Sequence, residues 1–588
     1  MKKILFSAIA LVGVLAVSSC SDFLQPTTEN QYSTDTYFNS DQEAIDAVDA
    51  CYSRFLEEDF LGRQIMWEQA AANDFVWGRT RSFNELATMS MTTSVGCLND
   101  VWTQIVRTIS RTNWVVESLL KKQSKTELTE VEKRSLGEAY FCRALSHFYL
   151  AYRYGTDKQG VPFVKYEDFE GGYNNEIPTQ QASVCDNYRM IVEDLNAAEE
   201  LLPKCEEYGD DNFGRAHKAA CAGYKAKVYT YWACWDKNQY ANVITEVNKM
   251  ENDYGRSING VEFTDNFTSD YSKWRNSEYV WTIPSEGGPK GVYGGVEFPG
   301  VILDNGLYGF FNCWGQFKPS LEAFNELSGD NDNLIDTSKG NIRLKNSIAE
   351  YGDKLELWGM TDFHFYSDRD IESGFMIIKY AEPFCHGEGK YGEPDSTGTK
   401  PWVVTKSAVE LGYVGDNGDW PVSRINFPLM RFADCILLRA EAYLATSRPD
   451  AAAKDINTVR NRSNVKSLTG NATWTDLYHE RRRELMFEHS DHLYDCKRWA
   501  VGGDSEIQTL ALAELNSHPN VRHYTDRLNP GEYDDQGVFV PNKDFTEGPY
   551  LDYQEPAPQW EDYKIVFPYQ SSEISKANGA LKQNEGYN

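Results

Sequence analysis

Aromatic and short polar side chains gather at two places along the chain, and together these residue types could bind a sugar. The first place is residues 73–79, with the sequence NDFVWGR, and the second extends from Tyr293 through Tyr308 to Trp314. Sugars present apolar C–H faces edged by hydroxyl groups, so a sugar site needs flat rings for stacking and polar groups for hydrogen bonds. The alternative is that these rings fill a small core beneath surface loops.

Carboxylates with helical spacing form a second set of candidate chemical groups. Glu480, Glu484 and Glu488 lie four residues apart, with Arg481 among them and Arg498 further along the chain. Spaced carboxylates can act as a general acid and base. The alternative, which we adopt below, is a network of ion pairs that holds the last helices together. His479-Glu480 does not begin a zinc-protease motif, because position 483 is Arg where the second His would have to be.

Two loops resemble ligand loops only in part. The segment from Asp330 to Asp336 has oxygen ligands at alternating positions, as a calcium loop does, but Ile335 occupies the position where glycine is expected and no Glu stands at the twelfth. We predict a solvated turn, with structural calcium as the alternative. The glycines of residues 412–418 lack the preceding strand and following helix of a phosphate-binding loop, so we predict a loop on which Tyr413 could contact a ligand.

The composition indicates a folded globular protein and excludes several partners. The 588 residues are 41% hydrophobic and 25% charged. The net charge of −30 argues against nucleic acid or an anionic lipid surface, because phosphate binding needs an excess of Lys and Arg. The cysteines that follow Cys20 form no C-x-x-C pair, so neither a disulfide framework nor a zinc site is predicted. Cys142, Cys221, Cys234 and Cys435 are expected to be free thiols inside helices.

The N-terminus reads as a secretory signal that ends at a lipidation site. Met1-Lys2-Lys3 is followed by an apolar run over residues 4–17, which is too short to span a bilayer. Small residues then lead to Cys20, and this segment resembles the lipobox of bacterial lipoproteins, in which the thiol is diacylated. Two acyl chains would give stable membrane attachment. The alternative is an ordinary cleavage site with a chance cysteine.

Apolar residues at helical spacing predict the elements that must position these groups. Helices are predicted over residues 98–120, 136–154, 184–202 and 216–235, as two antiparallel hairpins, with Gly155 ending the second helix. Helices are predicted again over 429–445, 451–462 and 475–489, and the tail after Gly502 is expected to be irregular. Between 252 and 420 the periodicity fails, and short strands are predicted over 278–283 and 374–380. Trp102 and Trp281 are assigned to the core.

Several segments, in a fixed order, carry a resemblance to one family. They are Glu138–Leu145 with Tyr152–Gly155, Asp194–Pro203, Gly214–Ala220, Arg431–Ala442 with Val459–Arg462, Glu480–Glu488 with Lys497–Trp499, and Phe567-Pro568 with Gln583–Tyr587. In these segments, and in the stretch that follows Cys20, the chain resembles the SusD/RagB family nearly from end to end. The resemblance also favours the structural interpretation of residues 480–488, which the family uses in its scaffold.

The resemblance implies a mainly α fold, with a TPR-like scaffold of helical hairpins and a large loop-rich insertion that contains a few short strands. The expected organisation is a signal peptide over 1–19, a lipid anchor and tether over 20–40, a helical region over 41–251, the insertion over 252–424, a continuing helical region over 425–502, and an irregular segment over 503–588 that packs on the scaffold.

The resemblance further implies a lipoprotein without catalytic activity, on the outer membrane and facing the cell exterior. It would bind an oligosaccharide and deliver it to a SusC-like TonB-dependent transporter, with no cofactor. The family commonly builds its ligand site from the two aromatic regions; the candidate contacts are Asp74, Trp77, Arg79, Tyr293, Tyr308, Trp314 and Tyr413. Two alternatives stay open. One is capture of peptides or glycopeptides, as in the RagB branch, and the other is a surface glycoside hydrolase, for which the sequence offers no distinguishable carboxylate pair.

Overall fold

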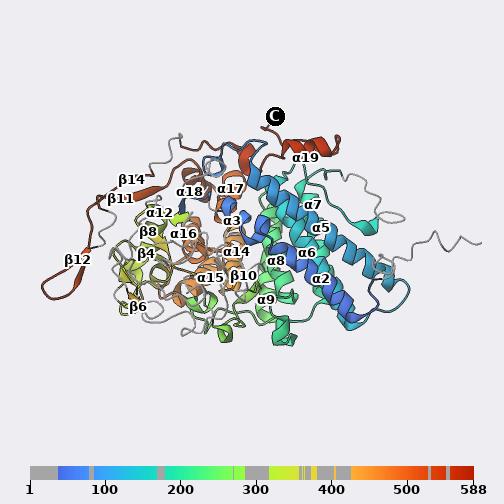
Figure 1. Ribbon diagram of the computed structural model, residues 1–588, viewed down its shortest axis with the longest axis horizontal. Coiled ribbons are helices and arrows are strands. Elements are labelled where there is room, and N and C mark those ends of the chain that lie inside the picture. Colours follow the sequence, from blue (N-terminus) through green and yellow to red (C-terminus); the bar gives the residue numbers. More distant parts are fainter. Residues whose placement is uncertain are drawn as a thin grey trace, which may run out of the picture.

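The computed structural model describes residues 37–587 except 70, 78–84, 169–178, 269, 285–316, 356–359, 362, 365–372, 381–402, 405–424, 490, 527–530 and 551–556. The fold is mainly helical (Figure 1). Its α-helices are α2 (Asp41–Phe55), α3 (Gln64–Gln69), α5 (Gly96–Gln123), α6 (Glu130–Tyr154), α7 (Val184–Leu201), α8 (Lys218–Trp232), α9 (Tyr240–Asn252), α12 (Leu321–Ser328), α13 (Ile342–Lys345), α14 (Phe432–Ala445), α15 (Pro449–Arg462), α16 (Trp474–Leu485), α17 (His492–Gly502), α18 (Ser505–Leu515) and α19 (Ser571–Lys576).

The described strands are short and pair two by two. They are β1 (Phe75–Trp77), β2 (Tyr279–Ile283), β3 (Phe317–Pro319), β4 (Ile348–Glu350), β5 (Lys354–Leu355), β6 (Met360–Thr361), β7 (Phe363–His364), β8 (Phe375–Ile377), β9 (Val403–Val404), β10 (Phe427–Arg431), β11 (Asn520–Tyr524), β12 (Gly531–Tyr533), β13 (Phe539–Pro541) and β14 (Phe545–Pro549). The antiparallel pairs are β1 with β3, β2 with β10, β4 with β8, β5 with β7, β6 with β9, β11 with β14 and β12 with β13.

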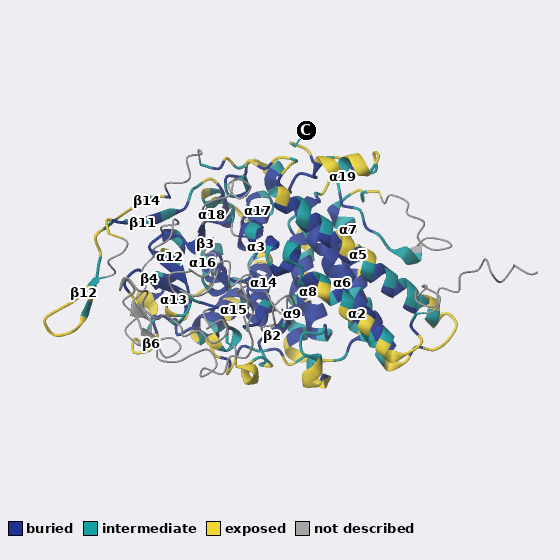
Figure 2. Ribbon diagram, in the orientation of Figure 1, coloured by how far each residue is buried: buried dark blue, intermediate teal, exposed yellow. Residues whose placement is uncertain are grey.

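Helices α2 and α5 to α9 gather at one end of the molecule, and α14 to α18, together with α3, occupy its middle (Figure 1). Helix α6 is the centre of the first group, since α5, α7 and α2 all pack against it. It begins with a capping box in which Thr129 and Glu132 bond to each other's backbone N–H groups, an arrangement that satisfies donors at a helix start. Figure 2 shows buried residues concentrated where the helices meet, with exposed residues on outer turns and loops.

Buried charges on α6 are paired with residues from other elements. Arg143 is bonded to Asp194 of α7 at 2.8 Å, and Arg153 to Glu68 of α3 at 2.6 Å. All four side chains are almost completely buried. A buried charge without a partner is costly, so these pairs fix how α6 sits against its neighbours.

The last part of the chain returns to the first helices. The Phe567 N–H donates to the carbonyl of Arg153, and the Tyr569 ring stacks on the Tyr154 ring at a centroid distance of 5.1 Å. The indole N–H of Trp102 in α5 donates to Glu573 of α19. One continuous hydrophobic core therefore includes residues from Phe38 to Leu581.

The helical hairpins predicted from periodicity are confirmed as α5 with α6 and α7 with α8. The predicted strands are present as β2 and β8, and Trp102 and Trp281 are buried, as expected. Within the described part of the chain, all nine cysteines are free and six of them are buried, which agrees with the expected free thiols.

Three predicted elements were wrong in part. Residues 429–431 belong to strand β10, paired with β2, and the helix begins only at Phe432. Helix α16 ends at Leu485 because Met486 has a ψ of +133°, outside the helical range, and Phe487 follows with a φ of +62° in the left-handed region. Beyond Gly502 the chain forms helix α18, where the side chain of Asp504 caps the helix start by accepting from the Glu506 N–H.

Candidate ligand-binding site

The β1–β3 ladder joins the two aromatic regions that the sequence pointed to. Phe75 pairs with Pro319, Val76 with Lys318, and Trp77 with Phe317. Residues 73–77 lead into this ladder, and β3 directly follows the segment that contains Tyr293, Tyr308 and Trp314. Two segments separated by more than 200 residues therefore start from adjacent points on the scaffold.

Hydrogen bonds from Ser320, which directly follows β3, tie it to the two residues that precede β1. The hydroxyl of Ser320 donates to the carbonyl of Asn73 at 2.5 Å, and the Ser320 N–H donates to the carbonyl of Asp74 at 3.0 Å. Ser320 also caps the start of α12 by accepting from the Ala323 N–H. Rigid elements beneath a site reduce the entropy lost when a ligand binds. We call the β1–β3 ladder the platform, because it could support ligand-binding side chains.

The side chain of Phe75 packs inward. Its ring contacts Phe317 at a centroid distance of 6.1 Å and Phe487 at 5.2 Å. Val76 is fully buried, in a small apolar cluster with Val521 and Tyr550. Both side chains are thus part of the packing beneath the platform and are not available to a ligand.

Asp74 belongs to the scaffold. Its side chain is buried, and Oδ1 lies 2.7 Å from Nη2 and 2.8 Å from Nε of Arg482 in α16. A carboxylate held in this way has its charge neutralised and is shielded from solvent. We therefore reassign Asp74 from the expected ligand contacts to the anchoring of the β1 segment.

The remaining candidate contacts lie outside what the structure describes. The backbone places Trp77 as the last residue of β1, but its side chain is not among the described ones. Arg79, Tyr293, Tyr308, Trp314 and Tyr413 lie outside the described residues altogether. Their expected contact with a ligand stays a prediction.

Sequence reasoning did not single out Ser320 or Arg482. The order of Ser320 before an apolar helical pattern is typical of an N-cap, so a search for caps could have found it. The partner of Arg482 lies 408 residues away in the chain, and no local pattern predicts such a pair.

The carboxylates of residues 480–488 form a buried ion-pair network, as the structural interpretation expected. Arg431 contacts Glu278, Glu484 and Glu488 at 2.6–2.7 Å. Arg343 contacts Glu480 at 2.8 Å and Glu484 at 3.3 Å. The pairing is completed by Arg460 on Glu480, Arg462 on Glu278 and Glu484, Lys379 on Glu488, and Asp330 on Arg343.

The electrostatics of this network oppose acid–base catalysis by Glu484. Burial alone would raise the pKa of its carboxyl, but Arg462, Arg431 and Arg343 lower the pKa to about 2. A general acid or base works best with a pKa near the working pH, and it must be able to reach a substrate. Glu484 meets neither condition, because it is also completely buried.

The expected turn around Asp330 is solvated only in part. Asn331–Asn333 form a short 3₁₀ helix, and Asp336 accepts from the Ser338 N–H. Asp330 itself is fully buried, and its two oxygens each lie 3.0 Å from a guanidinium nitrogen, of Arg343 and of Arg483. The prediction of a solvated turn was wrong for this residue, and two adjacent arginines also oppose calcium there.

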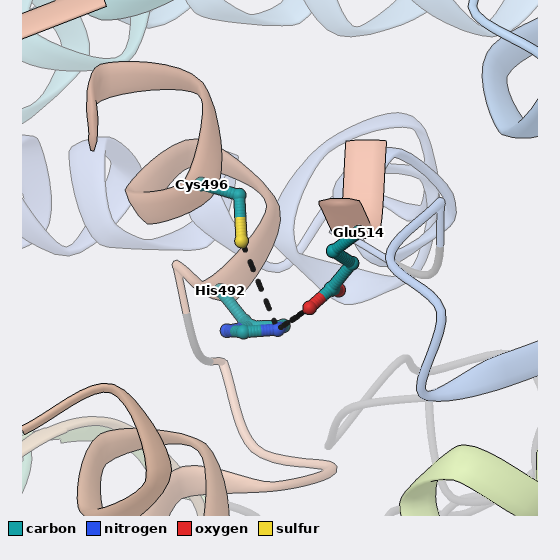
Figure 3. Close-up of side chains that lie close together, drawn as sticks. All are labelled: His492, Cys496 and Glu514. Atoms are coloured by element: carbon teal, nitrogen blue, oxygen red, sulfur yellow. Dashed lines mark hydrogen bonds and ion pairs between the residues drawn. The ribbon is translucent and has the colours of Figure 1, made fainter. Parts of the chain in front are cut away.

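One described cluster offers the ligand types that a metal ion prefers. His492 and Cys496 lie one turn apart on α17, and Glu514 faces them from α18 (Figure 3). Nε2 of His492 lies 2.9 Å from a carboxylate oxygen of Glu514 and 3.9 Å from Sγ of Cys496. Imidazole, thiolate and carboxylate groups at such spacing can bind zinc.

The surroundings of this cluster account for it as a polar network. Nη1 of Arg482 lies 3.4 Å from Oε2 of Glu514. The Glu514 carboxylate also accepts hydrogen bonds from the Tyr478 hydroxyl and the Asn73 N–H. Burial and the charge of Glu514 raise the pKa of Cys496 to about 11, so the thiol stays protonated. A neighbouring guanidinium and a protonated thiol both disfavour a metal ion. We assign this cluster to the anchoring of residue 73 on α17 and α18.

Among the described residues, no helix combines the length and the apolar composition that crossing a bilayer requires. The helices instead stack as pairs around a shared core, with irregular segments attached at strand pairs. The fold is that of a mainly α protein with a TPR-like scaffold.

Two family models match the chain, one after the other. The model described as "Starch-binding associating with outer membrane" matches residues 22–230, and the model described as "SusD family" matches residues 222–587. The second match alone covers more than half of the chain. The protein belongs to the SusD family.

Known relatives and solved structures agree with this membership. SusD-like protein P2 of Formosa agariphila is 22% identical over 562 residues, which cover 90% of this chain and 96% of the relative. Surface glycan-binding protein A from Bacteroides uniformis is similar in structure, with a TM-score of 0.63, 18% identity and coverage of 93% and 99% of the two chains. A structure described as solved with a xylogluco-oligosaccharide has a TM-score of 0.62, 18% identity and coverage of 91% and 98%. At these identities the structural similarity shows the fold.

Proposed function

We propose that this protein captures an oligosaccharide at the platform built on β1 and β3, and that it cleaves no bond in it. The observation that carries the proposal is the β1–β3 ladder, because it pairs Trp77 of the first aromatic region with Phe317, which closely follows the second region in the sequence. Asp74, just before β1, is ion-paired to the buried scaffold. Membership in the SusD family supports the same function. Two solved proteins of the same fold, one named as a surface glycan-binding protein and one described with a xylogluco-oligosaccharide, add to this support.

The ligand contacts in this proposal are Trp77, Arg79, Tyr293, Tyr308, Trp314 and Tyr413. The rings would stack on the C–H faces of the sugar, and Arg79 would donate hydrogen bonds to its hydroxyl groups. Asp74 contributes indirectly, by fixing the β1 segment to Arg482 of α16.

The proposal extends to the protein's place in the cell. Acyl chains on Cys20 would hold the protein to the outer membrane, facing the cell exterior, and a SusC-like TonB-dependent transporter would receive the sugar. The description of the family model over residues 22–230, which names association with the outer membrane, supports this location.

The test is a binding measurement on paired tryptophan variants. A glycan array and a peptide library identify the best ligand of the parent protein, and calorimetry then measures its affinity for the Trp77→Ala/Trp314→Ala double variant. We expect the affinity to fall by about 30-fold or more, since each of the two stacking rings contributes on the order of 1–2 kcal/mol. Trp474→Ala, which removes a partly exposed ring at the start of α16, is the matched control and should leave the affinity unchanged.

Unchanged affinity in the double variant would remove this site assignment. Binding of peptides in place of glycans would favour the peptide-capture alternative. New reducing ends after incubation of the pure protein with the bound glycan would show hydrolysis and contradict capture without cleavage.

A further inference from the structure

An open cavity of about 740 Å³ lies at a second place on the molecule, and the proposed function does not use it. Its lining comes from five parts of the chain: residues 156–159 after α6, Trp235 after α8, Val501 near the end of α17, the segment 561–566, and residues 584–586. It shares no lining residue with β1 or β3. The volume is within the range of about 300–1,000 Å³ that is usual for small-ligand sites.

The walls of the cavity are fixed by hydrogen bonds among these segments. The Thr156 N–H donates to the carbonyl of Gln159, and the side-chain amide of Gln159 donates to Oδ1 of Asn584 at 3.1 Å. Asn584 in turn donates to the carbonyl of Phe567 at 2.8 Å. Gly586 has a φ of +88° and lies so close to the Tyr563 ring that an added Cβ would meet the ring at 2.3 Å. The cavity is therefore preformed, and its neutral amide groups are already engaged.

The charged groups at the cavity are mostly acidic. Four carboxylates line it, and Lys158 is its one lysine. Lys158 lies 4.0 Å from Glu585, and both side chains are more than three-quarters exposed, so this pair is weak. The four carboxylates are those of Asp157, Glu561, Asp562 and Glu585. Glu561 also lies 3.5 Å from Lys564, so the acidic excess comes mainly from Asp157 and Asp562. A ligand that carries positive charge would gain from this excess.

Two aromatic residues, Trp235 and Tyr563, line the same cavity and are half-buried. Rings beside carboxylates suit an organic cation, because the face of a ring attracts an ammonium group while its apolar surface packs against carbon. One common mode of peptide binding holds the peptide backbone on a free strand edge. The described lining offers no such edge, since Thr156 and Gln159 pair with each other and Asp562–Ile565 form a 3₁₀ helix.

We propose that this cavity binds a cationic sugar, namely an oligosaccharide with protonated amino groups, as a second ligand site. The rings of Trp235 and Tyr563 would pack against the sugar faces, and Asp157, Glu561 and Asp562 would accept hydrogen bonds from its ammonium groups. The site is independent of the β1–β3 platform, so either site can exist without the other.

The experiment compares two sugars that differ in charge. Calorimetry at low salt and mildly acidic pH measures binding of the glucosamine trimer and of its neutral, N-acetylated counterpart to the full chain. We expect the cationic trimer to bind at least about tenfold more tightly. Equal binding of both trimers, or no binding of the cationic one, would overturn the proposal.

A charge-neutralising variant locates the binding. Asp157→Asn/Asp562→Asn keeps the shape of both side chains, and the new amide at position 562 retains an oxygen that can accept from the Trp560 indole. We expect about a tenfold loss of affinity for the cationic trimer and an unchanged melting temperature. The matched control is Glu127→Gln, which neutralises a side chain that is 88% exposed in the loop between α5 and α6. An equal loss in both variants would show a general charge effect and contradict the site.

Two further measurements separate the remaining outcomes. If a lysine tripeptide binds as tightly as the glucosamine trimer and loses affinity in the same variant, the cavity recognises charge alone and the sugar assignment is wrong. The Trp77→Ala/Trp314→Ala variant should bind the cationic trimer as the parent does. The measurements therefore test the proposed ligand site at β1–β3 and the proposed cavity site separately.

Discussion

At the scale of single residues, the most consequential feature is the buried ion-pair network around α16. Arginine and lysine side chains there contact carboxylates in an extended network, which continues through Arg483 to Glu326, and each of these buried charges has at least one partner of opposite sign. Such a network is only weak evidence of added stability, because removing charges from water is costly. Its consequence is instead that losing any one member leaves an unpaired charge in the core.

We expect Arg431→Met to lower the free energy of unfolding by about 3–5 kcal/mol, because it leaves three buried carboxylates short of a cation. Chemical denaturation followed by circular dichroism measures this loss. The control is Arg189→Met, which removes a guanidinium that is 54% exposed and pairs with Asp186 and Glu193 on α7. That change should cost less than about 1 kcal/mol. Equal losses of unfolding free energy in the two variants would show that the buried network does not make Arg431 more important for stability than an exposed arginine.

At the scale of elements, the junction between α6 and α7 shows a correct prediction with a different cause. The sequence predicted that Gly155 ends α6. Glycine is common at helix ends because it adopts left-handed backbone angles easily. In the structure the φ of Gly155 is −105°, which any residue can adopt. Glycine is needed because the chain passes close by: an added Cβ would lie 2.7 Å from Cγ2 of Val184 and 2.8 Å from the carbonyl oxygen of Ala151.

Gly155→Ala should therefore destabilise the protein by about 1–3 kcal/mol, the usual cost of overpacking a well-packed site. The melting temperature, measured by calorimetry, would fall accordingly. Gly209→Ala is a matched control, since nothing lies within 4 Å of an added Cβ there. If Gly155→Ala were as well tolerated as Gly209→Ala, the close approach of α7 would not be the reason for the glycine.

The sequence predicted elements well where the signal is local and poorly where pairing is distant. Helices α5 to α8 follow from apolar spacing, because each buries one face or more against a neighbour. The run that contains Leu429 and Met430 is apolar throughout, so spacing could not distinguish strand β10 from a helix. Its pairing with β2, more than 140 residues earlier, decides the conformation.

The same limit applies to the candidate site. The residue types around Trp77 indicated a display region, and its pairing with β3 is consistent with that expectation. Asp74 looked like a ligand group because it is polar and lies among aromatic residues. Only the fold brings Arg482 within reach and shows that the carboxylate is internal.

At the scale of the whole molecule, buried histidines make stability depend on pH. Burial, with the nearby charges of Arg143 and Lys165, lowers the pKa of His147 to about 3. Its ring is used as a neutral group, since Nδ1 bonds to the carbonyl of Arg143 and Nε2 accepts from the Val164 N–H. The folded pKa lies below the ordinary value of 6.5. The stabilisation is therefore complete above about pH 6.5 and is lost as the pH falls toward 3.

Between pH 5 and 6, the parent protein should lose stability through His147 at about 1 kcal/mol per pH unit. We expect His147→Gln to reduce the slope of unfolding free energy against pH by that amount, whatever its effect on stability at neutral pH. Denaturation midpoints at several pH values measure the slope. An unchanged slope would mean that His147 does not stay neutral in the folded protein.

The return of the C-terminal segment to α5 and α6 has a consequence for how the chain is made. Trp102 and Tyr154 emerge early in synthesis, whereas Tyr569 and Glu573, which cover them, are translated more than 400 residues later. The first helices must wait with part of their apolar surface uncovered until these later residues have been made. A chain that stops short of residue 567 would keep that surface open, and it would be recognised by chaperones and proteases as unfinished.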